Sequence, residues 1–120
     1  MVKINKEFQE LIPSLTEEEY QQLEENLVNE GWRKNEFIVI WNDYIVDGHN
    51  RYEICKKNKI DYKITELKLK TKEDVFIWII KNQFGRRNIS PYDRGRLALR
   101  LKEIIATKIQ EKTQMIVILN

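Results

Sequence analysis

The nine residues of Tyr44–Tyr52, YIVDGHNRY, decide how the centre of this chain folds. Ile45 and Val46 end an apolar, β-rich run, whereas Arg51 falls in the first turn of a segment that we expect to be helical. Gly48 stands between them, in a turn that a side chain would obstruct. Helix N-termini present unpaired N–H groups and the positive end of the helix dipole, so this turn is suited to holding a phosphate.

A second motif, NQFGRRNISP, occupies Asn82–Pro91. Together with DGHNRY at Asp47–Tyr52, it resembles the two signatures of the superfamily of ParB N-terminal domains and sulfiredoxins. The resemblance extends over roughly Phe8 to Leu101. It implies an α/β (α+β) fold of the ParB/sulfiredoxin-like type, in which helices flank a small mixed sheet.

Composition places the chain among soluble globular proteins, because 42% of its 120 residues are hydrophobic and 33% are charged. We found no linker or repeat, so we expect a single ParB N-terminal-like domain over residues 1–120, with the last helix and an apolar tail at about 91–120. The lone Cys55 favours a reducing compartment. Neither a membrane-spanning run nor a signal peptide is found, and we therefore expect a cytoplasmic location without membrane partners.

Charge is segregated along the chain. Met1–Gly31 contains two lysines and eight glutamates, whereas Lys81–Lys102 contains seven basic residues and one aspartate. The basic segment is suited to phosphates, either on a nucleotide or on a DNA backbone. An alternative is that the two segments attract each other within the fold.

The first half of the chain predicts a helix and a hairpin. Thr16 and Glu19 form a capping box for a helix at about Glu17 to Glu30, and Gly31 ends that helix. The β-rich runs Phe37–Trp41 and Tyr44–Val46, joined by Asn42-Asp43, predict a hairpin with a tight turn. We expect an irregular apolar lead-in before this helix, formed by Phe8, Leu11 and Ile12.

The second half predicts helices around one more strand. A short helix should end near Asn58, and alternating apolar residues over Ile60–Leu69 predict a strand. Thr71–Phe84 forms the next helix, which Gly85 ends, and Ser90-Pro91-Tyr92-Asp93 caps the last one. The expected buried stripe of the last helix consists of Leu97, Leu101, Ile104 and Ile105.

The two motifs supply the candidate nucleotide site. Arg51 is its strongest member, because a guanidinium offers a planar fork of donors to phosphate, although a surface ion pair is the plain alternative. The resemblance implies that the loop after Gly85 helps to enclose the phosphates of a nucleotide. We expect this nucleotide to be CTP or ATP. The residues that we expect to bind it are Gly48, His49, Asn50, Arg51, Arg86, Arg87 and Asn88.

Two further residues of the first motif could take part in chemistry. His49 is the only histidine, so it cannot belong to a multi-histidine metal site, but it could donate to phosphate or transfer a proton. His49 is therefore the catalytic candidate of this motif, as a proton-transfer group. Asp47 could bind a Mg²⁺ ion that enters with the nucleotide, or cap the following helix, and we favour the cap.

Departures from the family patterns leave several activities open. ParB has Gly-Glu-Arg-Arg where this chain has Gly48–Arg51, and the acidic residue of the second motif is Asn82 here. The missing acidic residue argues against hydrolysis of the nucleotide, and nucleoside triphosphatase activity is one of the activities left open. Sulfiredoxin has its catalytic cysteine at the position of His49. The Asp-Gly-His-x-Arg form also resembles the free serine kinases. Phosphoryl transfer to serine would need a base, for which Glu17, Glu18 and Glu19 are carboxylates of this chain.

A metal-dependent nuclease ranks lower, because it needs several carboxylates and only Asp47 lies within a motif; Asp61, Asp74 and Asp93 would have to converge. A non-catalytic DNA-binding or dimerisation module is a further alternative. We expect Trp41 and Trp78 in the core and Trp32 at the surface. The resemblance implies a homodimer, a role in plasmid or mobile-element partition or replication, and DNA contact through backbone phosphates.

Overall fold

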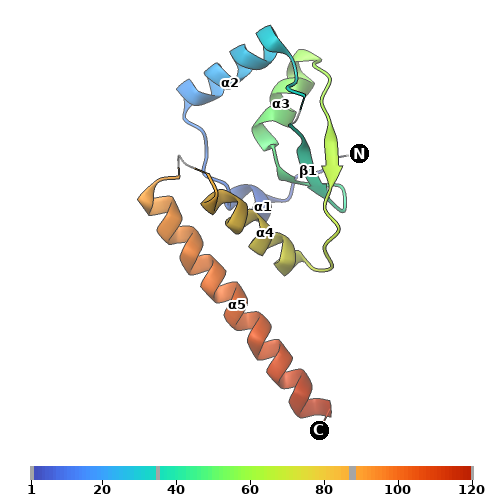
Figure 1. The fold of residues 1–120 in the computed structure, drawn as a ribbon, viewed down its shortest axis with the longest axis vertical. Coiled ribbons are helices and arrows are strands. Elements are labelled where there is room, and N and C mark those ends of the chain that lie inside the picture. Colours follow the sequence, from blue (N-terminus) through green and yellow to red (C-terminus); the bar gives the residue numbers. More distant parts are fainter. Residues whose placement is uncertain (1, 35, 87–88, 120) are drawn as a thin grey trace. The chain divides into compact units, whose positions relative to one another are not determined.

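The computed structural model describes residues 2–34, 36–86 and 89–119, with side chains described up to Met115. It forms two compact units, Met1–Lys70 and Thr71–Asn120, each of which is described by itself. That the chain acts as one domain stays a prediction. The elements are α1 (Lys6–Glu10), α2 (Glu17–Glu30), β1 (Ile38–Trp41), β2 (Tyr44–Asp47), α3 (His49–Asn58), β3 (Ile64–Glu66), α4 (Lys72–Phe84) and α5 (Pro91–Leu119) (Figure 1).

The first unit is built on a three-stranded mixed sheet of order β2-β1-β3. β1 pairs antiparallel with β2 and parallel with β3. The predicted hairpin is confirmed, since Asn42 and Asp43 have φ values of 47° and 69°, the left-handed pair that a tight two-residue hairpin turn requires. The predicted third strand forms, but it is confined to β3, because Ile60 and Tyr62 leave the ladder to pack on the core.

Helix α2 confirms the predicted bounds and capping box. The Thr16 hydroxyl accepts from the Glu19 N–H at 3.1 Å, and the Glu19 carboxylate accepts from the Thr16 N–H at 3.0 Å. Helices α2 and α3 pack together through Leu27, Ile54 and the buried Cys55. A second cluster, Ile38, Ile40 and Ile45, lies on the sheet, and the rings of Trp32 and Tyr62 contact both clusters.

Two predictions for the first unit are wrong. The expected irregular lead-in is helix α1, whose N-cap Asn5 accepts from the Phe8 N–H, and Phe8 is fully buried with its ring edge against Trp41. Trp32 is half-buried and not a surface residue. Its indole N–H donates to the Glu36 carbonyl at 2.7 Å, which satisfies the polar end of the ring while its apolar body packs inward.

The second unit is a pair of helices, α4 and α5, that pack side by side. Thr71 is the N-cap of α4, one residue before the helix begins. Ser90 caps α5 by accepting from the Asp93 N–H at 3.1 Å, as the Ser90–Asp93 pattern predicted. The guanidinium groups of Arg94 and Arg100 lie 5.6 Å from the ring centres of Phe84 and Phe76, respectively. These contacts cross between the two helices and add cation–π attraction to the apolar packing.

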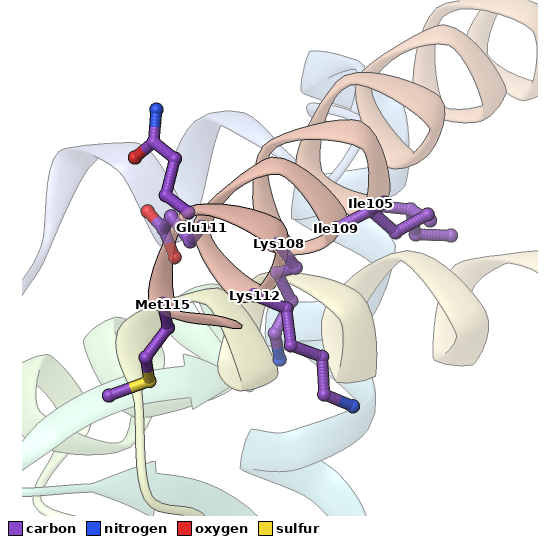
Figure 2. A pocket seen from close by; sticks show the side chains of 7 residues that line it. Ile105, Lys108, Ile109, Glu111, Lys112 and Met115 are labelled. Atoms are coloured by element: carbon purple, nitrogen blue, oxygen red, sulfur yellow. The ribbon is translucent and has the colours of Figure 1, made fainter. Parts of the chain in front are cut away.

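The predicted buried stripe of α5 is only partly correct. Leu97 and Ile104 are buried, but Ile105 is 43% exposed. The 29-residue α5 is more than twice as long as the 13-residue α4, so its later turns are not covered by α4. Residues of α5 line a shallow pocket of about 720 Å³. Ile105 lies toward one end of it and Met115 toward the other, with Lys108 and Lys112 between them (Figure 2). The predicted apolar tail continues this helix to Leu119.

No helix in the described part of the chain is both long enough and apolar enough to cross a membrane.

An ion pair between Lys108 and Asp74 joins α5 to the first turn of α4, and it predicts a pH dependence. Hydrogen bonds from Lys108 and Thr71 lower the pKa of Asp74 below its usual value. The ionised carboxylate therefore stabilises the folded chain above its unfolded pKa of about 4, and this contribution is lost as the pH falls through the lower folded pKa. We expect Asp74→Asn to flatten the fall in urea-unfolding free energy below about pH 4. If the unfolding free energies of the wild-type chain and Asp74→Asn depended on pH in the same way, this role of Asp74 would be contradicted.

Candidate phosphate site at the start of helix α3

Gly48 joins β2 to α3 in a conformation that strongly favours glycine. Its φ of 102° and ψ of 24° are left-handed, and the Tyr52 N–H donates to its carbonyl at 2.9 Å, which begins the helix. A Cβ atom at Gly48 would also lie 3.3 Å from Cγ1 and 3.4 Å from Cα of Ile38. Both the backbone conformation and the close approach of β1 therefore explain the glycine, as the sequence predicted.

The N-terminus of α3 receives no side-chain cap. The favoured capping role of Asp47 is therefore wrong, because Gly48 occupies the N-cap position and Asp47 is still the last residue of β2. The Asp47 carboxylate instead attracts the imidazole of His49. An uncapped helix start leaves first-turn N–H groups to solvent or to an anionic ligand, which is the property that the sequence suggested for this turn.

Arg51 forms an ion pair with Glu36, in which Nη2 lies 3.4 Å from Oε1. The two side chains are 33% and 28% exposed, so this is not a fully solvated surface pair. Arg51 Nε is buried without a hydrogen-bond partner among the described residues. The guanidinium lines a cavity of about 200 Å³, which is also lined by Leu23, Asn26, Leu27, Glu30, Gly31, Arg33 and Glu36. Phosphate contact by Arg51 stays a prediction.

His49 and Asn50 line a different cavity, of about 370 Å³. Burial lowers the pKa of His49, against the opposing effects of Asp47 and of a hydrogen bond with the Ile45 backbone. The neutral imidazole is thus favoured near neutral pH, which weakens the expectation that it donates charge-assisted hydrogen bonds to phosphate. The other residues that line this cavity are Ile4, Gln9, Tyr52, Glu53, Lys56 and Lys57.

The second motif lies in the second unit. Gly85 ends α4, and the N–H of Arg86 donates to the Gln83 carbonyl at 3.0 Å. Arg86 is exposed. Arg87 and Asn88 fall outside the described residues. Because each unit is described by itself, a shared site for Arg51 and Arg86 remains a prediction.

Other candidate catalytic groups have structural partners. Glu19 is held in the capping box, and hydrogen bonds with Thr16 lower the pKa of its carboxyl group, which makes Glu19 a weaker base. Burial raises the pKa of Cys55, so its thiol is a poor nucleophile. Asp93 accepts from the Ser90 hydroxyl at 2.9 Å. Over residues 2–34, 36–86 and 89–119, no three His, Cys, Asp or Glu side chains form a metal-binding group.

Several residues beside the turn were not anticipated from the sequence. Lys56 lies seven residues after His49, so helical spacing could have placed it on the same face of α3. Arg33 and Glu36 follow α2 and reach Arg51 only through the fold, and no local pattern in the sequence marks them.

No protein-family model and no curated protein match this sequence. Solved structures do match its fold. One is the C2221 form of a Pnob8-like ParB-N domain, with 20% identity and a TM-score of 0.77, covering 98% of this chain and 47% of that one. Another is a pNOB8-like ParB N-domain, with 22% identity and a TM-score of 0.77, covering 95% of this chain and 42% of that one. The chain spans less than half of the length of these structures. It has the fold of the ParB N-domain, with a small mixed sheet and flanking helices, as its two motifs predicted.

Proposed function

We propose that this chain is a partition-protein-like domain that binds a nucleotide through its phosphates at the start of α3. The observation that carries the proposal is the uncapped first turn of α3, which follows the left-handed Gly48 and contains Arg51, in a chain with the ParB N-domain fold. Backbone N–H groups and a guanidinium are the donors that phosphate oxygens accept. The biological role would be plasmid or mobile-element partition or replication, with the chain acting as a homodimer.

The remaining motif residues would shape the nucleotide site. The Asp47 carboxylate lies beside the turn and could bind a Mg²⁺ ion held by the phosphates, because Mg²⁺ commonly takes one or two protein carboxylates together with phosphate oxygens. Arg86, Arg87 and Asn88 would contribute from the second motif. The choice between CTP and ATP depends on contacts with the base, whereas the turn supplies groups suited to phosphate.

A thermal-shift screen tests this function. The intact chain would be heated with each common nucleoside triphosphate, with and without Mg²⁺, and we expect at least one to raise the melting temperature. A ligand at 100 times its Kd stabilises the folded state by about 2.7 kcal/mol, so even moderate affinity is measurable. Absence of any shift, together with absence of binding by calorimetry, would contradict nucleotide binding.

A product assay on any nucleotide that binds then separates the activities. Diphosphate without another phosphorylated product would indicate a triphosphatase switch, whereas phosphoserine formed in the presence of serine would select the kinase alternative. Recovery of unchanged nucleotide would indicate binding alone. Light scattering in the same buffers would show whether nucleotide promotes the proposed homodimer.

DNA contact is a second candidate function, favoured by the basic first turns of α5. Arg94 and Lys102 are exposed there, although Arg96 and Arg100 have carboxylate partners within the helix. We expect duplex DNA to bind without sequence preference and to lose affinity steeply between 50 and 200 mM salt, because phosphate contacts release counterions. Fluorescence anisotropy of a labelled duplex across this range would measure the slope. Binding that ignores salt would contradict contact through phosphates.

A further inference from the structure

The backbone of Glu36 is anchored by two hydrogen bonds, and its carboxylate pairs with Arg51. The Glu36 N–H donates to the Arg33 carbonyl at 3.2 Å. The Glu36 carbonyl accepts from the Trp32 indole at 2.7 Å, and the Trp32 ring packs edge-on against Tyr62 within the core. The backbone of Glu36 is thus tied to the half-buried Trp32, and the Glu36 side chain extends from this anchored position to Arg51.

Two guanidinium groups meet at this carboxylate. Glu36 Oε1 lies 3.4 Å from Arg51 Nη2 and 3.9 Å from Arg33 Nη1. Both arginines line the 200 Å³ cavity, and Glu30 pairs with Arg33 at 3.8 Å on its other side. A carboxylate and a phosphate group use the same guanidinium donors. Glu36 therefore competes with an incoming anion for these two guanidinium groups.

We propose that Glu36 is a built-in competitor for phosphate at this site, which an anionic ligand must displace to reach Arg51 and Arg33. The proposal rests on the proposed function, because it concerns the same guanidinium of Arg51. It adds Arg33 as a second cation for the ligand, and it makes the Glu36 carboxylate the group that sets affinity. A phosphate that enters without displacing Glu36 would face its negative charge.

Replacing the competing charge tests the proposal. Glu36→Gln keeps the shape of the side chain but removes its charge, and we expect it to bind the triphosphate found in the screen, or inorganic tripolyphosphate as a general probe, about three- to fivefold more tightly. This is the order expected for relief of one charge contact in a partly exposed site. The gain should shrink as salt is raised. Glu36→Asp, which shortens the side chain and keeps the charge, should give a smaller gain.

Glu30→Gln is the matched control, because Glu30 lines the same cavity and pairs with Arg33 but has no described ion pair with Arg51. The affinity of Glu30→Gln for the same probe should differ from that of the wild-type chain by less than about twofold. An equal gain in both variants would overturn the proposal in favour of a general charge effect. Unchanged or weaker binding by Glu36→Gln, while the wild-type chain binds, would overturn it and leave the proposed function standing. If neither wild-type chain nor variant binds any phosphate probe, both proposals fail.

Discussion

Replacing Gly48 by alanine is expected to lower the free energy of unfolding by about 2–4 kcal/mol. Part of the loss comes from the left-handed conformation, since φ is 102° and an L side chain there is strained. The rest comes from the new Cβ atom, which would meet Ile38 Cγ1 at 3.3 Å and Ile38 Cα at 3.4 Å. Ile38 is a fully buried residue of β1, so it has little room to yield.

Two other glycines separate these effects. Gly31 has a φ of 74° and a ψ of −168°, another conformation that L side chains rarely adopt, and no atom lies within 4 Å of an added Cβ, so Gly31→Ala should show a conformational cost without a steric clash. Gly95 lies in α5 with open space around it, and Gly95→Ala should be neutral or stabilising by up to about 1 kcal/mol. Urea unfolding of the three variants measures the series. If Gly48→Ala were as stable as Gly95→Ala, the tight β2–α3 turn would be refuted.

The sequence predicted best those elements that local interactions define. The capping box placed α2 at its observed bounds, the Asn42-Asp43 pair formed the expected turn, and Gly85 ended α4. Helix α1 was missed because its five residues carry too little helical pattern, and its position depends on the contact between Phe8 and the distant Trp41.

Burial was harder to predict than secondary structure. Trp32 is half-buried because its indole N–H donates a hydrogen bond to the Glu36 carbonyl and its ring packs against two core clusters. The sequence does not reveal these contacts. Ile105 follows the buried Ile104 by one position, which turns its side chain about 100° around the helix and away from the buried face. The error at Trp32 therefore arises from tertiary context, whereas the error at Ile105 arises from the angle between neighbouring residues on a helix.

For the candidate phosphate site, the backbone conformation was predicted better than the positions of the side chains. The left-handed Gly48 turn and the start of α3 followed from the sequence, but the separation of His49 and Arg51 into two cavities did not. Residues two apart on a helix do not share a face, so this separation could have been anticipated. The Arg51–Glu36 pair could not, because it joins residues 15 positions apart, on either side of the β1–β2 hairpin.

Removal of the Arg51 side chain is expected to weaken nucleotide binding by about 10- to 100-fold, which is the loss for one or two hydrogen bonds between charged groups. The fold should persist, because the ion pair with Glu36 is about one-third exposed and contributes roughly 1 kcal/mol or less. Far-UV circular dichroism and the melting temperature would verify this. Lys63→Ala is a suitable control, since it removes one positive charge from an exposed position outside both motifs.

The most direct measurement is a calorimetric titration of the best-binding triphosphate into the wild-type chain, Arg51→Ala and Lys63→Ala at one salt concentration. We predict that Arg51→Ala loses at least a factor of ten in affinity, whereas Lys63→Ala stays within about twofold of the wild type. Equal affinities for the wild-type chain and a folded Arg51→Ala variant would contradict a phosphate site at the start of α3.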